Sequence, residues 1–198
     1  MAKRFFDVIA SGLALILLSP LLVVLALLVK LSSPGPALFR QPRLGRGARP
    51  FKIYKFRTMM NGATQGSRIT VDGDARVTRM GRILRRFDLD ELPTLFNVLK
   101  GDMSIVGPRP ELPEYLPYYS DEQRRVFSVR PGLTDPGTLA FRDEAGRLVG
   151  ANAEDVYLRE ILPHKLALNL EYVKKQSLLY DAAIIARTLA AVLLQSKV

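Results

Sequence analysis

The feature that most limits the fold is an uncharged stretch near the N-terminus. No residue in 8–29 carries a formal charge, and about 20 apolar residues are enough for a helix to cross a bilayer. The stretch is longer than the apolar region of a usual signal peptide, and no cleavage site of small residues follows it closely. A chain of 198 residues could hardly cover such a helix on every side. We therefore predict a helix in contact with lipid.

Ser19 and Pro20 interrupt the middle of this stretch. Proline has no backbone N–H, and its ring clashes with the carbonyl of the residue four positions earlier, which is Ile16. The helix should therefore kink or break at this point. In lipid the freed carbonyl needs a partner, and the hydroxyl of Ser19 is close enough to supply it.

The charges on both sides of the stretch bear on how it sits in the membrane. Short cationic flanks prefer the cytoplasmic side, so a straight helix with two cationic flanks would place one of them on the wrong side. A helix broken at Ser19-Pro20 could enter one leaflet and return, which leaves both flanks in the cytoplasm. We favour a re-entrant hairpin over residues 1–31, with a kinked straight span as the alternative. The flanking cations are Lys3, Arg4, Lys30, Arg40, Arg43, Arg46 and Arg49.

Composition excludes several kinds of site and indicates the charge of the partner. The chain has no cysteine, so it can form neither a disulfide nor a thiolate site. Its one histidine, His164, rules out metal sites built from several histidines. The formal net charge of +10 indicates an anionic partner, which could be nucleic acid, anionic lipid or nucleotide phosphates.

Residues 32–198 are predicted to form a small domain of the α+β class, mostly helical, at the cytoplasmic surface of the membrane. Residues 32–51 are rich in glycine, proline and arginine, which predicts a basic, turn-rich segment near the lipid headgroups. Alternating apolar and basic residues over 50–59 predict a short strand. Apolar spacing and helix start and stop signals predict helices at 78–87, 90–101, 153–176 with a break at Pro163, and 177–198.

The last of these helices is apolar but carries Asp181, Arg187 and a basic end. It is too charged to span a bilayer comfortably. We expect an amphipathic helix that lies on the membrane or packs under the first helix.

The stretch "RRFDLDELP" places Arg85 and Arg86 beside three carboxylates in a chain that is otherwise basic. We expect Asp90 to be the N-cap of the following helix, where unpaired backbone N–H groups hold a carboxylate ionised. Glu91 would point about 100° away on that helix. One side chain could then act as nucleophile or base while the other binds Mg²⁺. The alternative is that the acids only complement the helix dipole.

Cations beside rigid backbone recur at three further places. Lys55 and Arg57 belong to the stretch "KFRTM". Arg109 lies between two prolines in "GPRP", and Arg130 precedes proline and glycine in "RPG". Rigidly placed arginines are suited to clamp a diphosphate. The alternative for each is a role at lipid headgroups or in solvent.

Together these motifs resemble one family closely. A Ser-Pro-broken N-terminal segment is followed by "SPGPALFRQPRLGR", "FKIYKFRTM", "LRRFDLDELPTLFNVLKGDMSIVGPRP" and "VRPGLT". This pattern resembles the bacterial sugar transferases, the monotopic polyprenyl-phosphate phosphoglycosyl transferases, over residues 3–134. The block from "DELP" to "VGPRP" is its most specific part. The chain as a whole resembles the small form of the family, which consists of the catalytic core alone.

The resemblance implies an enzyme that begins glycoconjugate or polysaccharide assembly. Such enzymes move a sugar phosphate from a UDP-sugar to polyprenyl phosphate, for example undecaprenyl phosphate, release UMP and use Mg²⁺. By resemblance, Asp90 is the nucleophile that forms a phosphosugar intermediate, and Glu91 is its metal-binding partner. The protein would be monotopic, on the cytoplasmic face of the bacterial inner membrane and in contact with its lipids, with no nucleic-acid partner.

The same resemblance bears on the cations and on the membrane helix. It implies that Lys55, Arg86 and Arg109 face the diphosphate. Arg57 and Arg130 join them as substrate-binding candidates because of their rigid setting. The first helix of the family is re-entrant and broken at Ser-Pro, which corresponds to Ser19 and Pro20 and agrees with the argument from the flanking charges.

The segment after Thr134 departs from the family. Many members continue with a stretch like Gly-Trp-Ala-Gln, whereas this chain has Asp135-Pro136-Gly137-Thr138. The identity of the UDP-sugar, the pathway, the role of the later residues and the oligomeric state, a homodimer included, stay open. Two other interpretations also stay open: a non-catalytic basic membrane anchor, and a nucleic-acid-binding protein, although the chain contains no recognised nucleic-acid-binding module.

Overall fold

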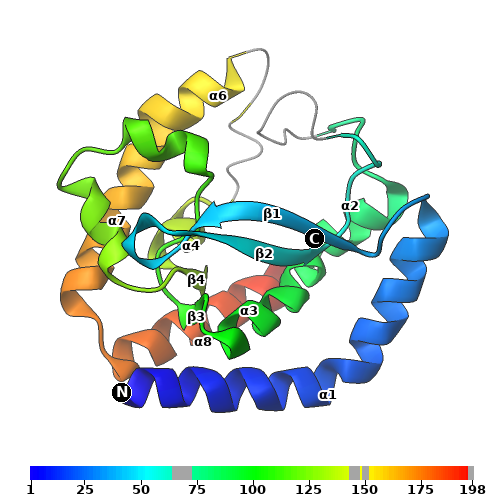
Figure 1. Cartoon of the computed structure of the whole chain (residues 1–198), viewed down its shortest axis with the longest axis horizontal. Coiled ribbons are helices and arrows are strands. Elements are labelled where there is room, and N and C mark those ends of the chain that lie inside the picture. Colours follow the sequence, from blue (N-terminus) through cyan, green and yellow to red (C-terminus); the bar gives the residue numbers. More distant parts are fainter. Residues whose placement is uncertain (64–72, 143–147, 149–151, 196–198) are drawn as a thin grey trace.

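The computed structural model describes residues 1–63, 73–142, 148 and 152–195. The long helix α1 (Ala2–Ser32) runs along one edge of the molecule, and the other elements lie on its inner side (Figure 1). The described residues form an α+β fold that is mostly helical, as predicted. The α-helices after α1 are α2 (Arg79–Arg86), α3 (Leu95–Lys100), α4 (Pro136–Ala140), α6 (Ala153–Val156), α7 (Leu162–Lys175) and α8 (Leu178–Gln195).

Helix α1 stays helical through Pro20 and bends sharply about midway (Figure 1). The hydroxyl of Ser19 donates to the carbonyl of Ile16 at 2.8 Å, which confirms the partner expected for that carbonyl. Among the described residues, α1 is the helix that is long and apolar enough to cross a membrane, and only 17% of its most apolar window is buried. Most of its apolar side chains are therefore free to contact lipid.

The N-terminal half of α1 is tied to the domain by polar contacts. The carboxylate of Asp7, 2% exposed, accepts from the hydroxyl of Ser104 at 2.8 Å and from the backbone N–H of Ile105 at 3.1 Å. Lys3 forms an ion pair with the buried Asp181 of α8. Arg4 donates to two carbonyls at the end of α3, with distances of 2.6 and 2.9 Å. These contacts hold the start of α1 against β3 (Ser104–Val106), α3 and α8.

The C-terminal end of α1 is tied to the same domain by Arg57. This side chain is buried, and its guanidinium donates to the carbonyls of Ser33 at 2.8 Å, Val29 at 3.3 Å and Pro34. Carbonyls at the end of a helix have no intrahelical partner, and cations are favourable there. Arg57 therefore completes the end of the apolar helix and joins it to β2 (Pro50–Phe56).

Two short sheets lie in the middle of the molecule. Strand β1 (Leu38–Leu44) pairs antiparallel with β2, from Leu38 opposite Phe56 to Leu44 opposite Pro50. Strand β3 pairs parallel with β4 (Gly132–Thr134). Strand β2 confirms the strand predicted at 50–59, although it ends three residues earlier.

The prediction of a turn-rich segment over 32–51 was wrong for its central part, which forms β1. Pro42 lies within β1 although a proline cannot donate to a ladder. In a sheet of two strands, however, each strand has an edge that is not paired within the sheet, and proline is tolerated at such an edge. The turn between the strands, η1 (Arg46–Ala48), has a left-handed backbone at Gly47, with φ of 69°.

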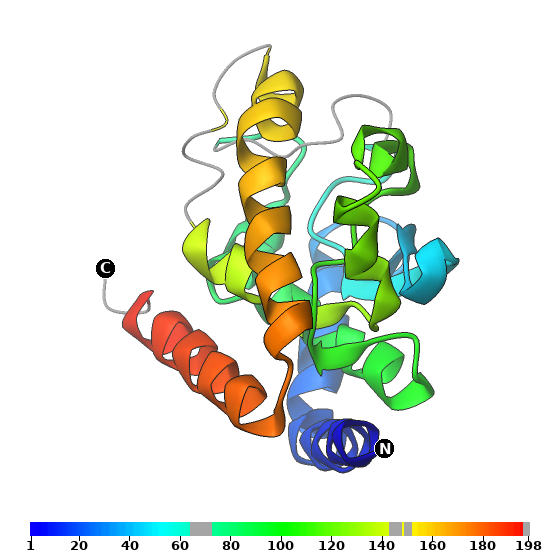
Figure 2. The ribbon, with the colours of Figure 1, turned by 90° about the vertical axis from the view of Figure 1, so that its left-hand side faces the viewer.

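Helix α7 continues from α6 across Pro163 instead of breaking there as predicted. A π-helical turn, η5 (Tyr157–Ile161), joins the two. A proline removes a backbone donor and crowds the preceding turn, and the wider π turn just before Pro163 accommodates both effects. Figure 2 shows α6, η5 and α7 as one long column along the side of the domain.

Helix α8 packs against the domain through one face. Ile184 and Asp181 are buried, and the hydroxyl of Tyr172 from α7 donates to Asp181 at 2.6 Å. The ion pair of Asp181 with Lys3 also brings the start of α8 to the start of α1, close to the packing predicted for 177–198. The other face carries exposed leucines, namely Leu178, Leu179, Leu189 and Leu194.

Asn97 joins α3 to β2. Its side chain is fully buried, accepts from the backbone N–H of Tyr54 at 2.9 Å and donates to the carbonyl of Lys52 at 2.8 Å. The sheet has only two strands, so one edge of β2 has no strand beside it. The side chain of Asn97 bonds to backbone groups of β2 in place of a further strand. Asn97 therefore fixes the distance between β2 and the turn that precedes α3.

Replacement of Asn97 by alanine should destabilise the fold by about 1–3 kcal/mol, because the N–H of Tyr54 and the carbonyl of Lys52 would lose the buried side chain that joins them to α3. The measurement is the thermal midpoint of the purified protein in detergent. Asn152→Ala is the control, since Asn152 is exposed and makes no side-chain cap bond at α6. Equal midpoints for the two variants would contradict the role of Asn97.

Candidate active site

The acidic stretch forms a 3₁₀-helical turn, η2 (Leu89–Thr94), that leads directly into α3. The residue before it, Asp88, has a left-handed backbone with φ of 53°, and its carbonyl accepts from the N–H of Glu91 at 3.2 Å. The prediction that Asp90 is the N-cap was wrong, because the left-handed turn shifts the helix start to Asp88. The stop predicted at Gly101 is confirmed, since Gly101 has φ of 95° after α3.

Asp90 lies in the first turn of η2 and is 9% exposed. Burial raises its pKa from 3.8 to about 6, with a further rise from the charge of Glu91, while Lys55 and Arg85 act in the opposite direction. The expected capping position would have lowered the pKa, so this prediction was also wrong. Because water is excluded, the ionised carboxylate is costly to bury, which favours reactivity toward an electrophile.

Glu91 is the most strongly paired carboxylate of the turn. Lys55 forms an ion pair with its Oε1 atom, and the guanidinium of Arg109 lies 3.5 Å from the same atom. Burial alone would raise the pKa of Glu91, but Lys55 and Arg109 outweigh it and lower the pKa to about 2. The structure thus brings together four of the residues singled out from the sequence, which are Lys55, Asp90, Glu91 and Arg109.

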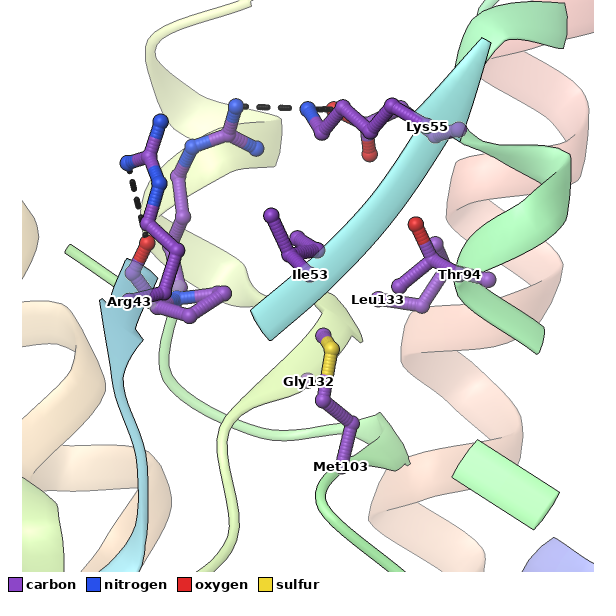
Figure 3. A pocket seen from close by; sticks show the side chains of 10 residues that line it. Arg43, Ile53, Lys55, Thr94, Met103, Gly132 and Leu133 are labelled. Atoms are coloured by element: carbon purple, nitrogen blue, oxygen red, sulfur yellow. Dashed lines mark hydrogen bonds and ion pairs between the residues drawn. The ribbon is translucent and has the colours of Figure 1, made fainter. Parts of the chain in front are cut away.

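A small pocket opens beside Glu91. Figure 3 shows Arg43 and Lys55 on opposite sides of this pocket, with Ile53 between them and Met103 below. Arg43 comes from β1, donates to the carbonyl of Pro110 at 3.2 Å and has a pKa lowered by burial. With three cations against one carboxylate in its lining, the pocket suits an anion.

Arg43 is a site residue that sequence reasoning missed, whereas Arg85 was expected beside Asp90 but was not among the predicted substrate-binding residues. Without β1, the sequence shows Arg43 only as a cation that flanks the apolar stretch. Arg85 donates to the hydroxyl of Thr58 at 2.9 Å, and its charge lowers the pKa of Asp90. The signal for Arg85 was its spacing on α2, where it faces inward while Arg82 and Arg86 are exposed.

Three predicted substrate-binding arginines lie elsewhere. The guanidinium of Arg57 is engaged at the end of α1, as described above. Arg130 donates to the carbonyl of Gly101 at 2.8 Å, at the opposite end of α3 from Glu91. Arg86 is exposed on α2, with its guanidinium 5.8 Å from the ring centre of Phe87. The structure does not bring these three side chains to the pocket.

The segment that departs from the family pattern has a structural role. Asp135 caps α4 by accepting from the backbone N–H and the hydroxyl of Thr138. The chain then reaches the start of η2, where Arg142 contacts the carboxylate of Asp88 at 3.1 Å. Residues 143–147 lie outside the described part of the chain.

The donor atoms of the turn fit a magnesium ion. Within the described residues no group of three or more acidic or histidine side chains could form a complete protein cage for a metal. Mg²⁺ usually binds through one or two carboxylates together with substrate phosphates and water. Adjacent carboxylates at Asp90 and Glu91 offer only oxygen, as Mg²⁺ requires, and Glu91 stays ionised over the whole physiological range.

Comparison with known proteins identifies the family of this chain. The family model described as "Bacterial sugar transferase" matches residues 1–195. The chain belongs to this family.

Several curated proteins are similar to this bacterial sugar transferase. A UDP-glucose:undecaprenyl-phosphate glucose-1-phosphate transferase of Caulobacter vibrioides is 44% identical, over 96% of this chain and 69% of the relative. A UDP-N-acetylgalactosamine-undecaprenyl-phosphate N-acetylgalactosaminephosphotransferase of Aeromonas hydrophila is 39% identical, over 96% of this chain but 43% of the relative. The exopolysaccharide production protein PSS of Rhizobium leguminosarum is 39% identical, over 98% and 96%. The chain thus spans less than half of some relatives and nearly all of others.

The raised pKa of Asp90 in this bacterial sugar transferase predicts a dependence of stability on pH. The folded protein holds the Asp90 proton more tightly than the unfolded chain does. The fold therefore loses stability as the pH rises from 3.8 to about 6, and the full loss is present above 6. Asp90→Asn should therefore be more stable than the wild type by about 1–3 kcal/mol at pH 8. The difference should shrink as the pH falls through 6.

Denaturation midpoints of both proteins between pH 5 and 8, in detergent with EDTA, measure this difference. Asp121→Asn is the control, since Asp121 is exposed. If the difference in midpoint between the wild type and Asp90→Asn stayed constant across this range, the raised pKa of Asp90 would be contradicted.

Proposed function

We propose that this protein is a phosphoglycosyl transferase, which moves a sugar 1-phosphate from a UDP-sugar to polyprenyl phosphate and releases UMP. Undecaprenyl phosphate is the acceptor in the names of the Caulobacter and Aeromonas relatives, and both names include a UDP-sugar. One observation carries the proposal: a buried aspartate with a raised pKa stands next to a glutamate that is gripped by Lys55 and Arg109.

The chemistry that suits this arrangement is nucleophilic attack at phosphorus. The ionised Asp90 would bond to the sugar-bearing phosphorus of the donor, and the phosphoanhydride bond to UMP would break. An oxygen of polyprenyl phosphate would then attack the same phosphorus and free the aspartate. Above a pH of about 6 the carboxylate is ionised yet poorly solvated, which makes it a better nucleophile than a carboxylate in water.

Cations around the pocket would hold the donor against the charge of the aspartate. A diphosphate repels a carboxylate, so the approach needs positive charge close to both. Lys55, Arg43 and Arg109 supply it from three different segments of the chain. Glu91, together with Asp90, would hold Mg²⁺, which supplies further neutralisation of the diphosphate when bound. Lys55 and Arg109 both contact the Oε1 atom of Glu91. A metal ion would therefore compete with these two cations or bind the Oε2 atom of Glu91.

The attachment of α1 supports a re-entrant arrangement in the membrane. Asp7 and Arg57 join the two ends of the helix to one small domain, with the bend at Pro20 between them. A helix that crossed the bilayer would have its ends on opposite sides, about 30 Å of hydrocarbon apart. We therefore propose that the bend enters one leaflet and that residues 32–198 rest on the cytoplasmic face of the inner membrane as a monotopic domain.

Asp90→Asn should abolish transfer while the protein still sediments with membranes, because the amide cannot attack phosphorus and the change leaves α1 untouched. Release of UMP from a UDP-sugar in the presence of undecaprenyl phosphate measures transfer. Incubation of the wild type with donor alone should add the mass of a sugar phosphate to the peptide that contains Asp90. Normal turnover of the Asp90→Asn protein would overturn the assignment of the nucleophile.

Cysteine labelling should find both ends of α1 on the cytoplasmic side. The chain has no cysteine of its own, so single cysteines at Ala2 and Ser33 can be probed with a membrane-impermeant maleimide in inverted and in right-side-out vesicles. Both should react only in inverted vesicles. A cysteine at Leu17, which is 78% exposed beside the bend, should react in neither if lipid covers it. Labelling of the two ends from opposite sides would show a straight span.

A further inference from the structure

The segment that carries Arg109 has neither helix nor strand, yet it must hold a guanidinium against Glu91. Its start is fixed where two motifs meet. The backbone N–H of Gly132 donates to the carbonyl of Pro108 at 2.9 Å, and a Cβ atom at Gly132 would lie 2.1 Å from the nitrogen of Gly107. Only glycine allows this approach. The contact places the beginning of 108–111 beside β4.

The end of this segment is held by β1. The N–H of Leu44 donates to the carbonyl of Glu111 at 2.9 Å, and Arg43 donates to the carbonyl of Pro110 at 3.2 Å. Together these bonds attach the end of the segment 108–111 to the last two residues of β1. The position of Arg109 therefore depends on the side chain of Arg43, next to it in space and 66 residues earlier in the chain.

Arg43 is itself a half-buried cation, and its guanidinium also donates to the side-chain oxygen of Gln41 at 2.9 Å. Burial lowers its pKa, and Glu111 is the strongest influence that raises it again. The Nε atom of Arg43 has no hydrogen-bond partner among the described residues. In the part of the chain that the structure describes, no ion pair or hydrogen bond joins Arg43 to Glu111. Glu111 therefore acts on Arg43 through its charge, and the strength of that attraction depends on where the carboxylate lies.

The hydroxyl of Tyr157 sets the place of that carboxylate. Glu111 is 6% exposed, and its Oε1 atom accepts from Tyr157 at 2.7 Å. Tyr157 is 5% exposed, begins the π-helical turn η5 and lies under the ammonium of Lys165, 5.5 Å from its ring centre. Packing on all sides leaves this ring one position, so the hydroxyl is a rigid donor.

We infer that Tyr157 and Glu111 are positioning residues for Arg109, which they act on through Arg43 and the carbonyl of Pro110. The inference rests on the proposed function, because that function makes Arg109 a cation that binds the diphosphate of the donor. Without the hydroxyl, Glu111 turns fully toward Arg43 and draws it away from Pro110. The segment 108–111 then loosens, and Arg109 binds the diphosphate less well while Asp90 keeps its reactivity.

The test compares two tyrosine-to-phenylalanine changes in one aromatic cluster. Tyr157→Phe should weaken the binding of UDP with Mg²⁺ about tenfold in calorimetry, because a preorganised cation is lost. It should raise KM for the UDP-sugar by a similar factor and leave kcat within about twofold. Tyr115→Phe is the matched control: the Tyr115 ring packs 5.8 Å from that of Tyr157, but its hydroxyl bonds to Glu154.

A double-mutant cycle shows whether Tyr157 acts through Arg109. Arg109→Lys keeps the charge but loses the forked guanidinium. In that background Tyr157→Phe should weaken UDP binding by less than about twofold, since the group it positions is already gone. A merely structural role would instead lower the thermal midpoint and weaken binding equally in both backgrounds.

The outcomes separate this inference from the proposed function. If wild type neither binds UDP nor turns over a UDP-sugar, the proposed function fails. If wild type is active and Tyr157→Phe matches Tyr115→Phe in UDP affinity and KM, or if the losses from Tyr157→Phe and Arg109→Lys multiply, the positioning role is overturned.

Discussion

The attachment of both ends of α1 to one small domain is the constraint on which the rest of the structure depends. Asp7 ties the first half of the helix to β3, and Arg57 ties its last turn to β2. Pro20 bends the helix between these points, and the Ser19 hydroxyl satisfies a carbonyl at the bend. An apolar surface therefore projects from one side of the domain, and the Asp90 turn lies at a set distance from it. The proposed transfer from a water-soluble donor to a lipid phosphate needs this arrangement.

The basic character of the chain divides between structure and chemistry. Arg4, Arg57 and Arg130 donate to backbone carbonyls at the ends of α1 and α3, where the helix dipole favours a cation. Lys55 and Arg109 instead surround Glu91. A net charge of +10 thus overstates how much positive surface is offered to an anionic partner, because many of these guanidinium groups are used inside the molecule.

Sequence reasoning succeeded where the cause is local and failed where it is not. The bend at Pro20 and the stop at Gly101 follow from the covalent geometry of single residues, and both are present. Asp90 was misplaced at a cap, because the left-handed turn at Asp88 cannot be read from the acidic pattern. Strand β1 was missed because its partner, not its own composition, makes it a strand.

By itself, the sequence determined an apolar helix with a break, a pair of adjacent acids and a set of cations beside rigid backbone. Residue type and spacing along the chain are enough for these, since each is a property of a few consecutive residues. Only the tertiary structure decided that Lys55, Arg109 and Arg43 meet at Glu91 whereas Arg57 and Arg130 complete helix ends. The pairing of β1 with β2 and the burial of the Asp90 turn bring distant segments together, and burial is also what shifts the pKa of Asp90.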